Sequence, residues 1–313
     1  MTKTRAGMSA GLLDIESLDR AEIEAILDRA HFFQPVGPGP YRRLDSLRGK
    51  TIVNLFFEAS TRTRVSFEIA AKRLGADTLS IAAQGSSVSK GESLVDTLNT
   101  LVAMRPNAIV MRHAASGAPH FLARHLQIPI VNAGDGTHEH PTQALLDART
   151  ILDRRTTLEG LRVAIIGDIA HSRVARSNVH LLSKFGAQIV LCGPPSLLPR
   201  ELEQLARGVH LAYDMADAIC NADVIMMLRV QLERQHEAPM SAGEYFHFYG
   251  LRLEHLSHAK PDVLVMHPGP INRGRELSSE VADSQRSVIL NQVENGVAVR
   301  MAVLERILGS EAA

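Results

Sequence analysis

Short apolar runs alternate with stretches of helical periodicity along most of the chain, and this alternation limits the fold more than any other feature. The expected strands are Thr51–Phe57, Ala108–Met111, Ile128–Val131, Arg162–Ile166, Gln188–Leu191, Asp223–Leu228 and Val263–Met266. The expected helices between them are Arg64–Leu74, Leu94–Met104, Thr142–Leu152 and Val174–Phe185. Strands that alternate with helices in this way form parallel sheets covered on both faces. The sequence therefore predicts an α/β protein.

The length of 313 residues exceeds what one hydrophobic core usually organises, so we expect two doubly wound domains, each a parallel sheet flanked by helices. We place the hinge in the helical stretch Thr142–Arg155, because a new series of strands begins after it. The first domain then covers residues 1–150 and the second covers residues 151–291. An apolar pattern over residues 292–308 predicts a C-terminal helix that packs back on the first domain. Near the N-terminus, Asp19 followed by Glu22 is typical of a helix start.

Composition excludes several classes of protein. Lys plus Arg equals Asp plus Glu at 34 each, so no global charge favours nucleic acid or a membrane surface. The two cysteines, Cys192 and Cys220, are too few for a disulfide framework or a cysteine metal cage, and we expect buried reduced thiols. No signal peptide or membrane-spanning run is visible, which predicts a cytoplasmic protein.

The segment Phe56–Arg64 places three hydroxyl residues and two arginines where a strand turns into a helix. The N-terminus of a helix binds phosphate through unpaired N–H groups and the positive end of its dipole. Ser60 and Thr61 offer hydroxyl groups, and an arginine fork matches phosphate oxygens. A plainer alternative is that Ser60 caps the helix and the arginines are solvated. The combination favours an anion site.

The segment His138–Gln143 again follows an expected strand and opens a helix, with Pro141 at the first helical position. His140 and Gln143 then lie at the mouth of the helix, where both can donate to a carbonyl oxygen. The alternatives are a simple cap or a metal site of His138, Glu139 and His140. A metal site needs further ligands at suitable spacing, and none accompany these residues in sequence, so we predict no metal.

Two further features are ambiguous by themselves. Arg112 ends a strand, and the carboxyl ends of parallel strands are the usual place for a ligand. The polar segment Ser86–Gly91 contains Lys90 and is either a plain connector or a lid that carries a functional lysine.

Phe57–Arg64 resembles the carbamoyl-phosphate signature of the aspartate/ornithine carbamoyltransferases, and His140–Gln143 resembles their second signature. The resemblance runs from about Leu18 to the C-terminal helix. It implies two domains that meet at an active-site cleft, the first for carbamoyl phosphate and the second for the acceptor. It implies that carbamoyl phosphate is bound by Ser60, Thr61, Arg62, Thr63, Arg112, His140 and Gln143. It also implies a homotrimer with shared active sites, in which Lys90, with Ser86 or Ser87, enters the neighbouring subunit's site.

The acceptor is indicated by the second domain. The segment Gly167–Arg173 follows a strand but lacks Gly-x-Gly-x-x-Gly spacing, which argues against a nicotinamide cofactor. By resemblance to the family's aspartate branch, the acceptor is bound by Lys90, Arg173, Arg229 and Gln231. Two arginines also suit a dicarboxylate, since each carboxylate can take a bidentate partner.

The segment Met266–Pro270 contains no cysteine, whereas the ornithine branch has a cysteine-containing loop there. The resemblance assigns backbone carbonyls of Gly269 and Pro270 to the carbamoyl amino group and a structural role to His267. Some aspartate-branch members carry leucine in place of Gly269, which a backbone contact tolerates.

The reaction implied is carbamoyl transfer from carbamoyl phosphate to L-aspartate in pyrimidine synthesis, without cofactor or metal. The catalytic residues would be Arg62, Thr63, Lys90, Arg112 and His140. A regulatory chain or a dihydroorotase is a possible partner. The alternatives are a carbamoyltransferase for another amine such as ornithine, a non-catalytic structural homologue, and, most distant, an NAD-dependent dehydrogenase.

Overall fold

All strand pairs in the two sheets are parallel, as the alternation of strands and helices predicts. The computed structural model describes residues 11–35, 41–82, 94–230 and 240–309. Contacts group the chain into two units: one holds the residues up to Leu145 together with those from Asn295 onward, and the other holds Leu146–Glu294. The chain therefore changes unit inside two helices, α5 (Pro141–Leu152) and α10 (Ile289–Leu308).

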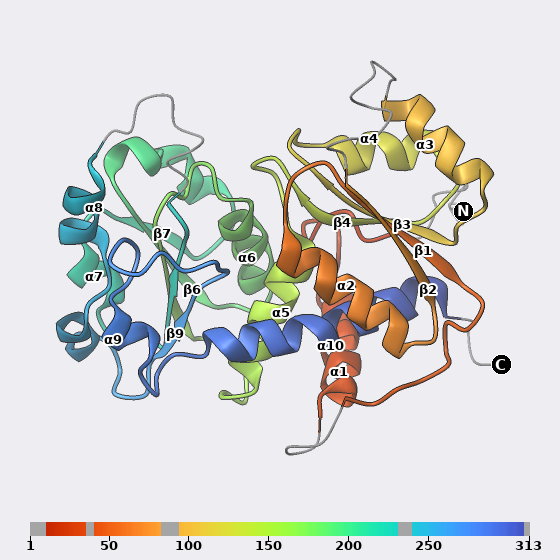
Figure 1. Ribbon diagram of the computed structural model, residues 1–313. Coiled ribbons are helices and arrows are strands. Elements are labelled where there is room, and N and C mark those ends of the chain that lie inside the picture. The colour runs from red at the N-terminus through yellow and green to blue at the C-terminus, as the bar shows by residue number, and fades with distance from the viewer. Residues whose placement is uncertain (1–10, 36–40, 83–93, 231–239, 310–313) are drawn as a thin grey trace, which may run out of the picture. The chain divides into compact units, whose positions relative to one another are not determined.

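The first unit has a sheet of strand order β2-β1-β3-β4 (Figure 1). Its strands are β1 (Thr51–Phe56), β2 (Asp77–Ala82), β3 (Ala108–His113) and β4 (Ile130–Asp135). Its helices, besides parts of α5 and α10, are α1 (Arg20–Phe33), α2 (Thr61–Arg73), α3 (Leu94–Ala103) and α4 (Ala118–His125). In Figure 1, α3 and α4 lie above this sheet and α2 lies below it.

Helices with buried apolar residues cover both faces of this sheet (Figure 1). Leu98 of α3 and Leu122 of α4 share a core with Val53, Leu55 and other apolar residues of the strands. Below the sheet, the last part of α10 is tied to the neighbouring helices by ion pairs and hydrogen bonds. These contacts are Arg29 with Glu305, Glu22 with Arg306, and Ser66 with Arg300.

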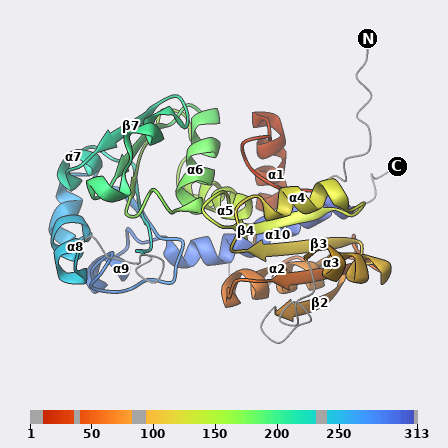
Figure 2. The ribbon, with the colours of Figure 1, turned by 90° about the horizontal axis from the view of Figure 1, so that it is seen from above.

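The second unit has a five-stranded sheet of order β7-β6-β5-β8-β9. Its strands are β5 (Arg162–Ile166), β6 (Gln188–Cys192), β7 (Val209–Ala212), β8 (Val224–Met227) and β9 (Leu264–Met266). Its α-helices are α6 (Arg173–Lys184), α7 (Met215–Ile219), α8 (Ala242–Tyr249) and α9 (Ser279–Ala282). Short 3₁₀ helices are η2 (Pro195–Leu197), η3 (Arg200–Gln204) and η5 (Leu253–Ser257). Figures 1 and 2 both show α6 on one side of this sheet and α7 and α8 on the other.

The predicted fold class is confirmed, and each of the seven predicted strands overlaps an observed strand. The two strands absent from the prediction, β2 and β7, are both edge strands. An edge strand exposes one side, so it does not need a continuous apolar run; Leu79 of β2 is accordingly 57% exposed. The predicted helix start at Asp19 is also confirmed, because Asp19 and Glu22 form a reciprocal capping box. Among the described residues, no helix is both long enough and apolar enough to cross a membrane.

Candidate functional site

The turn from β1 into α2 carries the hydroxyl and arginine side chains of the first motif. Ser60 precedes the helix, but its side chain makes no capping hydrogen bond to the backbone. Its hydroxyl donates instead to Thr63 Oγ1, 3.0 Å away. Thr63 is buried, whereas Thr61 and Arg62 are exposed. The alternative in which Ser60 serves as a side-chain cap is therefore wrong. The first turn of α2 also contains no acidic side chain, which would repel an anion.

Arg112, near the end of β3, is held by one residue that follows β1 and by one residue within β4. Its Nη2 donates to Glu58 Oε1 at 2.6 Å, and its Nη1 donates to the carbonyl oxygen of Ala133 at 3.3 Å. The arginine side chain is 12% exposed and that of Glu58 is 21% exposed. A charged pair with this much burial holds the guanidinium in one orientation. Glu58 lies within the first motif, but the sequence analysis assigned it no role. Only the strand order shows that it lies beside Arg112.

The loop from β4 into α5 positions His140 and Gln143. His140 is 4% exposed and Gln143 is 8% exposed, and the backbone N–H of Gln143 donates to the His140 carbonyl at 2.9 Å. The two carboxylate oxygens of Glu139 accept from the N–H groups of Ile15 at 3.0 Å and Glu16 at 3.2 Å, and neither Glu139 nor His140 belongs to the group of side chains close enough to share a metal ion among the described residues. The consecutive residues His138, Glu139 and His140 therefore do not form a metal site.

The carboxyl ends of β1, β3 and β4 are neighbours, because these strands are adjacent in the order β2-β1-β3-β4. This brings one set of predicted residues to the same edge of the first sheet: Ser60, Thr61, Arg62, Thr63, Arg112, His140 and Gln143. Lys90, Ser86 and Ser87 lie outside the described residues, and so does Gln231. The individual binding and catalytic roles of these residues stay predictions.

Arg173 of the second unit is the first residue of α6 and is 4% exposed. The turn before it passes close to the end of β8. Gly167 has a φ of +144°, and a Cβ at this position would lie 2.8 Å from the Cβ of Leu228. Only glycine fits both the backbone conformation and this close approach. The turn that leads to Arg173 therefore lies against the residue that precedes Arg229.

The loop with Arg229 and the loop with Gly269 and Pro270 are connected by one buried carboxylate. Glu276 is fully buried, and its oxygens accept from the backbone N–H of Val230 at 3.2 Å and of Asn272 at 2.8 Å. The side-chain amide of Asn272 donates a further bond at 2.8 Å. Burial raises the pKa of Glu276, and the bonds from Asn272 and Val230 oppose this rise. Sequence reasoning missed Glu276, because a single glutamate in a loop carries no periodic signal.

A chain of hydrogen bonds between buried polar groups supports the loop 267–270. The Gly269 N–H donates to His267 Nδ1 at 2.7 Å, and the His267 N–H donates to Gln292 Oε1 at 2.9 Å. Gln292 Nε2 in turn donates to Asp147 Oδ1 at 2.7 Å. The Gly269–Pro270 peptide bond is cis. His267 thus has contacts that suit its predicted structural role.

Two family models together match nearly the whole chain. The family model for the aspartate/ornithine carbamoyltransferase carbamoyl-P binding domain matches residues 11–153. The model for the Asp/Orn binding domain of the same family matches residues 159–307. The chain belongs to the aspartate/ornithine carbamoyltransferase family. The family predicted from the sequence is confirmed.

Relatives are similar over nearly their whole length. An aspartate carbamoyltransferase catalytic subunit from Solibacter usitatus is 79% identical, over 96% of this chain and 100% of the relative. The one from Syntrophotalea carbinolica is 56% identical, over 96% of both chains. Aspartate transcarbamoylase from Trypanosoma cruzi, solved with N-(phosphonacetyl)-L-aspartic acid, has a TM-score of 0.85 at 31% identity and covers 96% of both chains. Ornithine carbamoyltransferase from Pyrococcus furiosus has a TM-score of 0.87 at 32% identity, over 97% of this chain and 98% of the other.

Proposed function

We propose that this family member transfers the carbamoyl group of carbamoyl phosphate to the amino group of L-aspartate, giving N-carbamoyl-L-aspartate and phosphate in pyrimidine synthesis. The names of the relatives support the predicted activity and enzyme class. The structural observation that carries the choice of acceptor is the pair of arginines in the second unit. The adjacent strands β5 and β8 lead at their carboxyl ends toward Arg173 and Arg229. Two arginines suit the two carboxylates of aspartate, whereas the cationic side chain of ornithine would be repelled.

In the first unit, the hydroxyl groups of Ser60, Thr61 and Thr63 and the guanidinium of Arg62 hold the phosphate at the N-terminus of α2. This assignment rests on the absence of a side-chain cap and of acidic residues in the first turn. The leaving phosphate gains negative charge as the bond breaks, and Arg62 together with the helix dipole stabilises that charge.

The amine of aspartate attacks the carbonyl carbon, and negative charge develops on the carbonyl oxygen. Thr63, Arg112 and His140 donate hydrogen bonds to this oxyanion, and removal of one such donor typically costs about 2.7–4 kcal/mol of barrier. Gln143 and the backbone carbonyls of Gly269 and Pro270 orient the carbamoyl group. The proton lost by the amine passes to the departing phosphate. Because the reaction joins the substrates directly, it has no covalent enzyme intermediate, and much of the acceleration comes from positioning.

We also propose an assembly. The chain works as a homotrimer with shared active sites. The neighbouring subunit contributes Lys90 to each site, and Gln231 of the acceptor loop completes the contacts to aspartate. Mixed trimers of Lys90→Ala and Arg112→Ala chains would then regain up to about a quarter of wild-type activity, because each mixed trimer has one intact site. No recovery in proven hybrids would place Lys90 in its own chain's site. A regulatory chain or a dihydroorotase is a candidate partner, and the cytoplasm is the expected location.

The decisive assay follows phosphate release from carbamoyl phosphate with L-aspartate or L-ornithine as acceptor. Rapid release with aspartate and none with ornithine is the expected result. Release only with ornithine would support the alternative acceptor. Binding of both substrates without turnover would support the non-catalytic alternative.

A further inference from the structure

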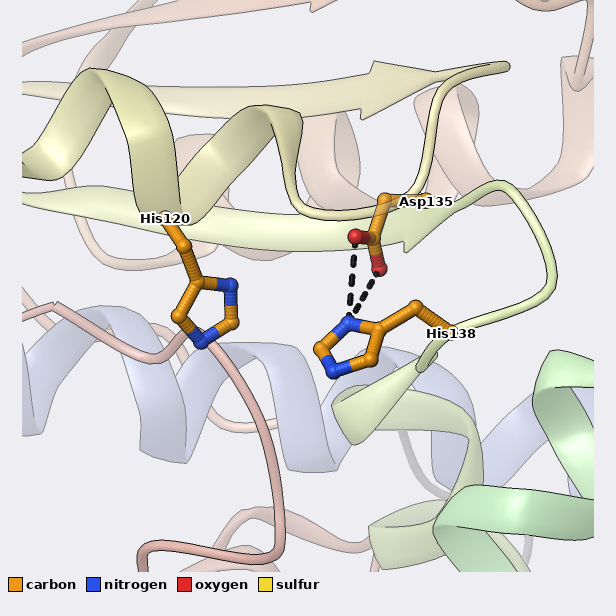
Figure 3. Close-up of side chains that lie close together, drawn as sticks. All are labelled: His120, Asp135 and His138. Carbon is orange, nitrogen blue, oxygen red and sulfur yellow. Dashed lines mark hydrogen bonds and ion pairs between the residues drawn. The ribbon is translucent and has the colours of Figure 1, made fainter.

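Three potential metal ligands converge in the first unit, and none of them is among the residues proposed to bind carbamoyl phosphate. His120 lies on α4, Asp135 ends β4, and His138 lies in the loop that follows (Figure 3). One ligand atom from each residue lies within 4.8 Å of the others. The Asp135 side chain is fully buried, and the two imidazoles are about one-third exposed. The sequence did not reveal this group, because His120 lies 15 residues before Asp135 and the three residues belong to three different segments of the fold.

The imidazole of His120 is oriented by a carboxylate outside the group of three ligands. His120 Nε2 lies 2.6 Å from Asp14 Oδ2. This contact leaves His120 Nδ1, which is buried and has no hydrogen-bond partner among the described residues. Histidines that bind metals usually donate their second ring N–H to a carboxylate, which fixes the ring and its tautomer. The contact between His120 and Asp14 has this form.

Asp135 is already held by three other donors: the N–H of Gly117 at 2.6 Å, Asn132 Nδ2 at 2.8 Å and the N–H of Glu139 at 3.2 Å. Only its side toward His138 is left for a cation. These bonds fix the carboxylate rigidly, as the supporting bonds of a metal ligand do.

Distances within the group are close to those of a tetrahedral zinc site. His138 Nδ1 lies 3.1 and 3.2 Å from the two Asp135 oxygens. A charge-assisted N–H···O bond is usually 2.7–2.9 Å long, whereas two ligand atoms on one tetrahedral zinc lie about 3.3 Å apart, given bonds of about 2.0–2.1 Å. The ring centroids of His120 and His138 are 5.2 Å apart. Two imidazoles on one such ion place their centres about 5 Å apart.

We propose that His120, Asp135 and His138 bind one Zn²⁺ ion, with water as the fourth ligand and Asp14 orienting His120. When the ion binds, it replaces the proton shared by His138 and Asp135, and that proton is released to solvent. The ion would connect α4, the end of β4 and the loop that leads to His140. None of its ligands is a proposed substrate contact, so its role is to stabilise this loop.

The test uses the full-length chain without a histidine tag, freed of metal by a chelator. Zn²⁺ is titrated calorimetrically, and Co²⁺ is added as a spectroscopic probe of tetrahedral coordination. We expect one Zn²⁺ per chain, an intense visible Co²⁺ spectrum, and a higher Tm with Zn²⁺. His120→Asn and His138→Asn should each lower the affinity at least tenfold, and Asp14→Asn should lower it about 10- to 100-fold.

His125→Asn is the matched control, since His125 is an exposed histidine on the same helix whose Nδ1 contacts the Phe121 carbonyl. It should bind Zn²⁺ like the wild type. Two separate histidine–aspartate pairs without a metal function are the competing explanation. Sub-stoichiometric Zn²⁺ or an octahedral Co²⁺ spectrum in the wild-type chain would overturn the proposal, even if a variant failed to fold.

Discussion

The two units carry their proposed functional residues at the same place, the carboxyl ends of parallel strands, but they hold these residues in different ways. In the first unit, Glu58, which holds the side chain of Arg112, keeps 21% of its own side chain exposed. In the second unit, the supports are buried: Glu276 and Asp147 are fully buried and Gln292 is 2% exposed. They fix backbone segments rather than the functional side chains themselves. The proposed anion site thus consists of side chains on a helix turn, whereas the proposed acceptor site depends on loops whose backbone is held by buried side chains.

The largest effect should come from the first unit. Arg112→Ala removes a proposed donor to the oxyanion, so kcat should fall about 100- to 1000-fold. Steady-state kinetics with both substrates would measure this. Arg124→Ala, which removes an exposed arginine of α4, should behave like the wild type. An unchanged kcat in Arg112→Ala would remove Arg112 from the chemistry.

A selective effect should come from the second unit. Arg229→Ala removes a proposed partner of an aspartate carboxylate, so KM for aspartate should rise about 10- to 100-fold. KM for carbamoyl phosphate should change little, because that substrate is assigned to the first unit. Arg207→Ala, at an exposed arginine of the same unit, is the control. Equal increases in both KM values would contradict the division of roles.

Glu276→Gln tests the buried support directly. The amide keeps the size of the side chain but places an N–H group opposite backbone N–H groups that the carboxylate accepts from. The loss of these hydrogen bonds should raise KM for aspartate about tenfold and lower kcat. Phosphate binding to the first unit, measured by calorimetry, should stay the same. Asp283→Asn, which alters an exposed carboxylate paired with Arg273, should have no such effect. Weaker phosphate binding in Glu276→Gln would mean that the two units are not supported independently.

Glu276 also predicts a pH dependence. Because burial raises its pKa, the folded state holds the proton more tightly than the unfolded state does. This contribution to stability is fully present below the unfolded pKa of about 4.3 and is lost as pH rises through the folded pKa. The free energy of unfolding of wild type relative to Glu276→Gln should therefore decline over that range. Urea unfolding at several pH values would show it, and a rise with pH would argue against the raised pKa.

The smallest effect concerns the core of the second unit. Cys192 is buried, whereas Cys220, at the end of the short helix α7, is exposed, so the prediction of two buried thiols is wrong for Cys220. Burial raises the pKa of the Cys192 thiol to about 12. Since the thiolate is the reactive form, a thiol reagent at pH 8 should label one cysteine in the native chain and two after unfolding, with little change in activity. Rapid native labelling of Cys192 would show that this core opens readily.

The sequence predicted the buried strands, including the edge strands β4 and β9, because burial on both faces requires continuous apolar runs, as in β1 and β5. It could not show the edge strands β2 and β7, whose exposed sides accept polar residues. The motif residues Ser60 to Thr63 and His140 were recognised by their order along the chain. Glu58, Glu276 and the group of His120, Asp135 and His138 were missed, because their partners are determined by strand order and loop packing. The predicted hinge, cleft and trimer stay predictions.

The return of α10 to the first unit has a consequence for synthesis of the chain. Residues 295–308 supply the partners of Arg29, Glu22 and Ser66, so the first unit to be translated is the last that can be completed. While the ribosome adds the later residues, the second unit is whole in sequence and can fold, but the first lacks its closing helix. Premature termination anywhere before α10 should thus leave a nascent first unit with an exposed apolar surface, a substrate for chaperones and proteases.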